Sequence, residues 1–197
     1  MSAAVRHDFQ TIAEWINPAS RVLDLGCGDG ALLTYLQESR STTGYGVEIT
    51  SDGVLASCKR GINVLQMNLE DGLNVFETSS FDYVILSRTL QAMHNTEGIL
   101  QEMLRVGRQG IVTFPNFGYW KNRLQVLAGR MPVSEEIPYQ WFDTPNIHLC
   151  TLDDFEELCS EVGAHVLQRS VIANGKEVRV LPNLLGSLAV YRFESEA

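Results

Sequence analysis

The chain lacks any apolar run that approaches the roughly 18 residues needed to span a membrane. Its N-terminal stretch, MSAAVRHDFQ, has no apolar core of signal-peptide length. Basic residues are few, with 15 Lys and Arg against 24 Asp and Glu, and the formal net charge is −9. No stripe of Lys and Arg is available to neutralise phosphates, so the composition disfavours a general nucleic-acid binder and a protein of anionic membrane surfaces.

Cysteine is also sparse, and the four residues (Cys27, Cys58, Cys150 and Cys159) form no CxxC pair. This disfavours a disulfide framework and a zinc site, and we expect reduced thiols, no bound metal and a cytoplasmic protein. Internal repeats, low-complexity tracts and linkers are missing as well. The 197 residues therefore predict one compact domain over 1–197.

The chain is organised around Arg21–Gly30, RVLDLGCGDG. An apolar run with one embedded acid, Asp24, breaks into a loop, and helical spacing follows over 31–38. A buried strand, a glycine turn and a helix start are the parts of a nucleotide-binding βα junction. Gly26 lets the chain turn sharply, and Gly28 and Gly30 leave room for the backbone to approach a ligand.

The acids around this loop distinguish between two classes of ligand. Asp24 and Asp29 would repel the pyrophosphate of a dinucleotide. They would not repel S-adenosylmethionine (SAM), which carries an amino group and a sulfonium. The residues favour SAM, and an NAD-dependent oxidoreductase is the weaker alternative.

A second short strand, 45–49, contains Glu48, 22 positions after Gly26. In a nucleotide-binding βαβ unit, an acid at this place accepts hydrogen bonds from both ribose hydroxyls. The alternative is a solvated acid at a strand end. Asp52 would cap the following helix, whose inner face would carry Val54, Leu55 and Cys58.

Ser87 follows a buried strand at 81–86, and Arg88 and Gln91 come directly after it. Ligands of open α/β sheets lie outside the carboxyl ends of strands, so these three residues are candidates for the site. The alternative for Arg88 and Gln91 is ordinary surface. Further strands are expected at 63–69 and 110–114, and two late strands at 165–173 and 188–193 should pair antiparallel.

Residues 115–150 are unusual, because they hold four of the six prolines and several large aromatics with little periodicity beyond a helix near 120–127. So long a connection is usually functional, as a lid or an interface. The alternative is a loop whose aromatics cover the sheet edge. We call residues 115–150 the insertion. A helix at about 8–17 should cap the domain.

LDLGCGDG resembles the first motif of class I SAM-dependent methyltransferases. Together with SRTLQAM and, above all, the stretch from Phe114 to Cys159, it resembles the MetW family of methionine biosynthesis proteins. The resemblance implies an α/β, Rossmann-like, three-layer αβα sandwich with a mostly parallel sheet of about seven strands. It also implies a role beside homoserine O-acyltransferase (MetX), which some members bind and activate.

The resemblance also implies a pocket for SAM or S-adenosylhomocysteine (SAH). Asn68 and Leu69 stand where class I methyltransferases often place an Asp and an apolar residue beside the adenine. The implied pocket residues are Asp24, Gly26, Cys27, Gly28, Glu48, Asn68, Leu69 and Ser87.

Catalytic residues stay unassigned. His94, His148 and Tyr139 are acid–base types without a visible partner. Two hypotheses follow: an accessory protein that senses SAM and grips an acyltransferase, or an active methyltransferase on an unidentified small acceptor.

Overall fold

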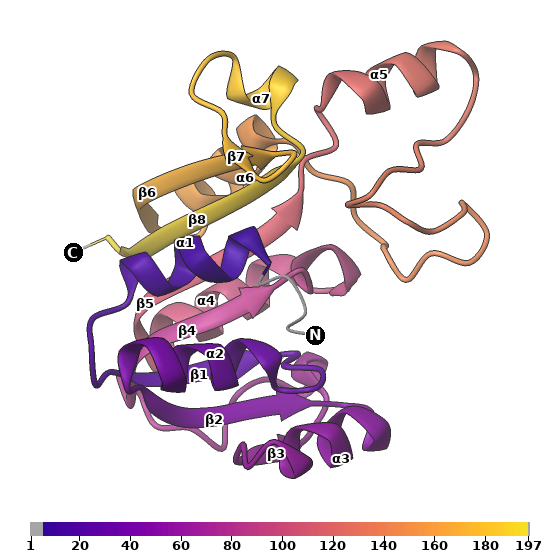
Figure 1. Cartoon of the computed structure of the whole chain (residues 1–197). Helices are drawn as coiled ribbons and strands as arrows, with labels where there is room; N and C mark the ends of the chain where they lie inside the picture. Colours follow the sequence, from indigo (N-terminus) through magenta and orange to yellow (C-terminus); the bar gives the residue numbers. More distant parts are fainter. Residues whose placement is uncertain (1–5, 197) are drawn as a thin grey trace.

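The computed structural model describes residues 6–196, so Met1–Val5 of the N-terminal stretch and Ala197 lie outside the described part of the chain. One sheet with strand order β3-β2-β1-β4-β5-β8-β6-β7 runs through the molecule (Figure 1). The strands are β1 (Arg21–Leu25), β2 (Thr43–Glu48), β3 (Val64–Gln66), β4 (Phe81–Ser87), β5 (Gly107–Pro115), β6 (Ala164–Ala173), β7 (Lys176–Glu177) and β8 (Leu188–Ser195). The α-helices are α1 (His7–Trp15), α2 (Ala31–Arg40), α3 (Ser51–Lys59), α4 (Thr96–Val106), α5 (Trp120–Leu127), α6 (Leu152–Glu161) and α7 (Pro182–Leu185), and two 3-10 turns are η1 (Leu69–Asp71) and η2 (Leu90–Ala92).

Strands β3, β2, β1, β4 and β5 are parallel to their neighbours, and β8 is antiparallel to both β5 and β6. The predicted mostly parallel sheet and the antiparallel pairing of the two late strands are confirmed. The sheet has eight strands because a turn at Asn174 and Gly175 returns the chain and adds the two-residue β7 to β6.

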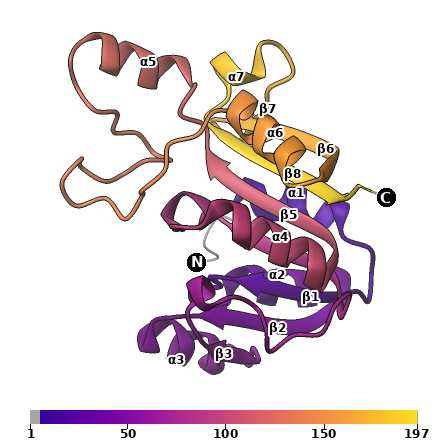
Figure 2. The same cartoon turned by 180° about the vertical axis from the view of Figure 1, so that it is seen from behind.

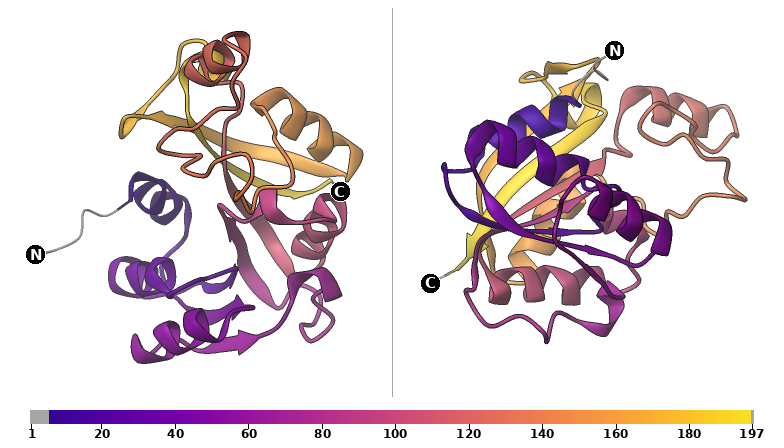
Figure 3. Two further views of the ribbon diagram at one scale, coloured as in Figure 1. Left: turned by 90° about the vertical axis from the view of Figure 1, so that its right-hand side faces the viewer. Right: turned by 60° about the horizontal axis from the view of Figure 1, so that its bottom comes forward.

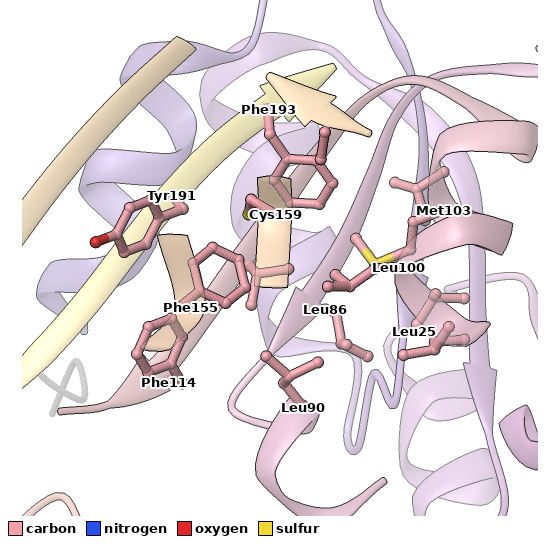
Figure 4. Packing of buried hydrophobic residues seen from close by; sticks show 14 of the residues in the cluster. Leu25, Leu86, Leu90, Leu100, Met103, Phe114, Phe155, Cys159, Tyr191 and Phe193 are labelled. Carbon is pink, nitrogen blue, oxygen red and sulfur yellow. The ribbon is translucent and has the colours of Figure 1, made fainter. Parts of the chain in front are cut away.

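Helices cover both faces of the sheet, which confirms the three-layer sandwich (Figures 1 and 2). α1 and α2 bury their apolar residues on one face, and α4 and α6 bury theirs on the other. In the core formed with α4 and α6, the ring centroids of Phe155 and Tyr191 lie 4.7 Å apart, and those of Phe114 and Phe155 lie 4.9 Å apart (Figure 4). This core fixes the carboxyl end of β5, where the insertion starts.

The prediction for α3 is wrong in its cap and in two of the three inner-face residues, because only Val54 of the three is half-buried. Thr50 caps the helix, since its Oγ1 accepts from Gly53 N at 3.2 Å. Ser57 is the fully buried residue, whereas Leu55 and Cys58 are exposed. The reason is close packing on the glycine loop: a Cβ at Gly30 would lie 3.0 Å from Ser57 Oγ, so only a small side chain fits there.

The insertion leaves the sheet at β5 and returns before α6 (Figures 1 and 3). Its two ends meet, since Phe117 N donates to Cys150 O at 3.0 Å. Trp141 and Phe142 are 72 % and 69 % exposed and therefore do not cover the sheet edge. Within residues 6–196, none of the helices has the length and apolar character that a membrane crossing requires.

Candidate functional site

The glycine loop follows the carboxyl end of β1, which lies beside that of β4, where Leu25 is in register with Leu86. Gly26 has φ +70°, and a Cβ there would lie 2.7 Å from Thr89 Oγ1. Gly28 has φ +56° with no atom within 4 Å of the position that its Cβ would take. Position 26 therefore requires glycine through close packing and positive φ, whereas position 28 favours glycine through its φ alone and leaves open space for a ligand to approach the backbone.

A cavity of about 700 Å³, which we call the main cavity, opens beside this loop. It is bordered by α1, the glycine loop, α2 and the end of β4. Five of the eight predicted pocket residues line it: Asp24, Gly26, Cys27, Gly28 and Ser87. The structure thus brings the loop and the end of β4 together, as ligand sites in open α/β sheets require.

Asp24 is the unusual group of this cavity. It is 2 % exposed, and its Oδ1 has no hydrogen-bond partner among the described residues. Burial raises the pKa of Asp24 to about 7, with nearby Arg6 opposing and Glu48 adding to the rise. A buried carboxylate without a donor of its own suits a ligand that brings a cationic donor.

Glu48 is buried next to the loop but does not line the cavity. Its Oε1 accepts from Thr50 N and Thr50 Oγ1, both at 2.8 Å, and its Oε2 accepts from Gly28 N at 2.9 Å. A carboxylate oxygen accepts two hydrogen bonds, so Oε2 retains one acceptor position. The ribose contact of Glu48 stays a prediction.

Asn68 and Leu69 also lie away from the cavity lining. Asn68 Oδ1 caps η1 by accepting from Glu70 N at 3.1 Å, and Leu69 packs against the core that contains α4. Their adenine contact stays a prediction as well.

The sequence pattern did not reveal two charged residues at the start of the described chain. Arg6 lines the cavity, and its Nη2 lies 3.4 Å from Ser87 Oγ. Arg6 also pairs with Asp8, whose side chain is fully buried. Their partners are Ser87 at the end of β4 and Arg88 directly after it, about 80 residues away in sequence, so no local spacing could mark them.

The candidate acid–base residues do not line the main cavity. His94 and Tyr139 are exposed, and the backbone N–H of His94 donates to Glu70 Oε1 at 2.7 Å. His148 lines a second cavity of about 180 Å³, together with Gln91 and Phe114. Burial raises the pKa of the Cys27 thiol to about 12, which keeps it protonated and unreactive at neutral pH.

Comparison with known proteins identifies a family that the sequence of this chain matches. The family described as "Methionine biosynthesis protein MetW" matches residues 6–193. A bifunctional methionine biosynthesis protein MetXA/MetW from Rhodopirellula baltica is 38 % identical over 204 residues, which cover 96 % of this chain. The match spans only 33 % of the length of that relative.

Solved structures support the fold. A SAM-dependent methyltransferase from Thermotoga maritima, described as a possible histamine N-methyltransferase, superposes with a TM-score of 0.68 at 19 % identity and covers 96 % of this chain and 88 % of its own. A SAM-dependent methyltransferase from Mesorhizobium loti superposes with a TM-score of 0.71 at 12 % identity and covers 96 % and 98 %. At such identities the likeness shows the class I methyltransferase fold alone.

Proposed function

The chain belongs to the MetW family of methionine biosynthesis proteins, and from this premise we propose that it is an accessory protein of homoserine O-acyltransferase that binds SAM or SAH. The exposed apolar surface of the insertion carries the proposal. Leu127, Trp141 and Phe142 are 81 %, 72 % and 69 % exposed. Exposed apolar clusters with large aromatics are typical of protein interfaces.

The relative in which MetXA and MetW occur in one polypeptide supports the identity of the partner. Fusion holds the MetXA and MetW parts of that relative close together, and a binding surface between the two parts would do the same without a covalent link. We infer that the insertion supplies this surface.

The residues of the main cavity fit SAM or SAH. Asp24 would accept from the ligand ammonium, since its Oδ1 lacks a partner among residues 6–196. Arg6 would pair with the ligand carboxylate, and the open space at Gly28 would admit the ligand beside the loop. When bound, SAM would supply an electrophilic methyl group. No histidine or tyrosine of the predicted acid–base set lines this cavity, which favours ligand sensing over catalysis.

Co-purification with the homoserine O-acyltransferase of the same cell tests the proposal. We expect a complex that Trp141→Ala combined with Phe142→Ala weakens by about 30-fold or more, as loss of an aromatic hot spot does. Val75→Ala is the control, because Val75 is 65 % exposed on another part of the molecule. Failure of the unmodified chain to bind the enzyme or to alter its activity would overturn the accessory role.

A second candidate is a methyltransferase with a small acceptor. The 180 Å³ cavity favours it, because this cavity lies between η2 and the carboxyl end of β5 and has His148 and Gln91 at its wall. Incubation with SAM carrying a labelled methyl group in a cell extract would detect transfer. A product that disappears with His148→Ala would support this candidate, and the absence of any labelled product would contradict it.

A further inference from the structure

Four charged side chains of alternating sign connect the main cavity with the insertion. Arg6 on the cavity wall pairs with Asp8 of α1. Asp8 Oδ2 lies 3.4 Å from Nε of Arg88, and Nη2 of Arg88 lies 2.9 Å from Oε2 of Glu136 in the insertion. These contacts bring together α1, the end of β4 and the insertion.

Asp8 lies between two of the other charged side chains, Arg6 and Arg88. Its side chain has no exposed surface, so its charge must stay paired within the protein. Arg6 and Arg88 both pair with the Asp8 carboxylate, and Arg6 makes the closer contacts with it. If Arg6 turns towards a ligand, Asp8 has to rely on Arg88.

The backbone of Arg88 is held in place while its side chain pairs with both Asp8 and Glu136. Its φ is +55°, which is uncommon for a residue with a side chain. Its N–H donates to Thr113 O at 2.9 Å and Thr113 Oγ1 at 3.1 Å, and this anchors the backbone on β5. The guanidinium lies between two carboxylates, and its Nε makes no hydrogen bond with the described residues.

We propose that the ion pair between Arg88 and Glu136 transmits ligand occupancy of the main cavity to the insertion, an inference that rests on the proposed function. A ligand carboxylate pairs with Arg6 and draws it from Asp8. Arg88 then moves towards Asp8 and away from Glu136. The segment around Glu136 then loses its ion pair with the core. Ligand binding thereby changes the exposed apolar surface of the insertion, which is the proposed binding surface for the acyltransferase.

The insertion contains amides that report this change. Ser134 N donates to Ile137 O at 2.9 Å, and Ile137 N donates back to Ser134 O at 3.2 Å. These two hydrogen bonds flank Glu136. The amides of Ile147 and His148 both donate to Gln91 O, at 2.8 Å and 3.0 Å, and mark the second contact of the insertion with the core.

Hydrogen exchange of the whole chain, with and without saturating SAH, tests the inference without any partner. We expect SAH to speed exchange at Ser134 and Ile137 by about fivefold or more, the lower end of ordinary coupling. Glu136→Gln should abolish this response, while SAH still binds. Glu135→Gln is the matched control, because Glu135 is exposed and its neighbour Glu136 makes the ion pair.

A second measurement separates this inference from the proposed function. The Kd of SAH is compared with and without the acyltransferase, and reciprocity requires the same coupling factor in both directions. If SAH binds but exchange at Ser134 and Ile137 does not change, or changes equally in Glu136→Gln, the inference is overturned. If SAH does not bind, or if the acyltransferase does not bind, the proposed function fails, and the separate binding measurements with SAH and with the acyltransferase show which part is wrong.

Discussion

Two buried carboxylates near the main cavity differ in how the protein balances their charge. Asp8 has two arginines beside it, whereas Asp24 has an oxygen without a hydrogen bond among residues 6–196. The consequence for Asp24 is a pKa raised from 3.8 to about 7, chiefly through burial. The folded state therefore holds the Asp24 proton more tightly than the unfolded state does, and this contribution to stability is lost as the pH rises from about 4 to about 7.

Asp24→Asn removes this titration from the ligand-free protein. Between pH 4.5 and pH 8, the free energy of unfolding of Asp24→Asn should rise relative to the unmodified chain by roughly 2–3 kcal/mol. Urea denaturation at both pH values measures the difference. Asp29→Asn, on the same loop but with a side chain that is 52 % exposed, should change it by less than about 1 kcal/mol. If the free energy of unfolding of Asp24→Asn relative to the unmodified chain does not change with pH, the raised pKa of Asp24 is contradicted.

Ligand affinity should depend on the same proton. The ammonium of SAH would bind ionised Asp24, so the affinity should increase roughly tenfold from pH 6 to pH 8 as the carboxyl loses its proton. Calorimetric titration at the two pH values checks this. An affinity for SAH that stays constant or falls over this range would show that ionised Asp24 does not bind the ligand ammonium.

Single residues also mark the limit of what the sequence could predict. Asp24, Gly26 and Gly28 were predictable because strand, turn and helix are contiguous and each glycine has a local geometric reason. The ion pairs of Asp8 with Arg88 and of Arg88 with Glu136 were not, because α1, β4 and the insertion meet only in three dimensions.

Among the elements, the connection from β5 to the insertion depends on one buried amide. Asn116 is fully buried, and its Nδ2 donates to Asn183 O at 2.9 Å and to Gly186 O at 2.8 Å. Its Oδ1 accepts from Gly118 N at 2.9 Å. One side chain thus joins the base of the insertion to both ends of α7.

Asn116→Ala should lower the free energy of unfolding by about 3 kcal/mol, because three backbone groups lose their partner and two of these hydrogen bonds are buried. Asn63→Ala, at an exposed asparagine whose side chain makes no hydrogen bond with residues 6–196, should cost less than about 0.5 kcal/mol. Denaturant unfolding of both variants measures the contrast. Equal values for the two would show that Asn116 does not hold the base of the insertion.

The elements themselves were largely predictable, since α5 and the parallel strands follow clear periodicity and α6 begins at its Thr151 cap with the reciprocal bond of Asp154. The path of the insertion between α5 and α6 was not. It contains no regular secondary structure, and its position follows from contacts such as those of Ile147 and His148 with Gln91 O.

At the scale of the whole molecule, the insertion is an excursion from a complete sandwich. The chain leaves and returns at one point, because Phe117 N and Cys150 O are 3.0 Å apart. The sheet order and both cores are built mostly from residues outside the insertion. The fold would therefore form the ligand cavity, and the insertion would add the partner surface.

Replacing residues 119–148 with a four-residue Gly-Ser linker tests this division. The shorter loop costs less closure entropy, which offsets part of the lost contacts, so the free energy of unfolding should fall by only about 1–3 kcal/mol. SAH should bind as before or up to about fivefold tighter, because Glu136 no longer competes for Arg88. Binding of the acyltransferase should disappear. Denaturation, calorimetry and co-purification measure the three properties, and a variant that unfolds without cooperativity or loses SAH binding would show that the insertion is part of the fold itself.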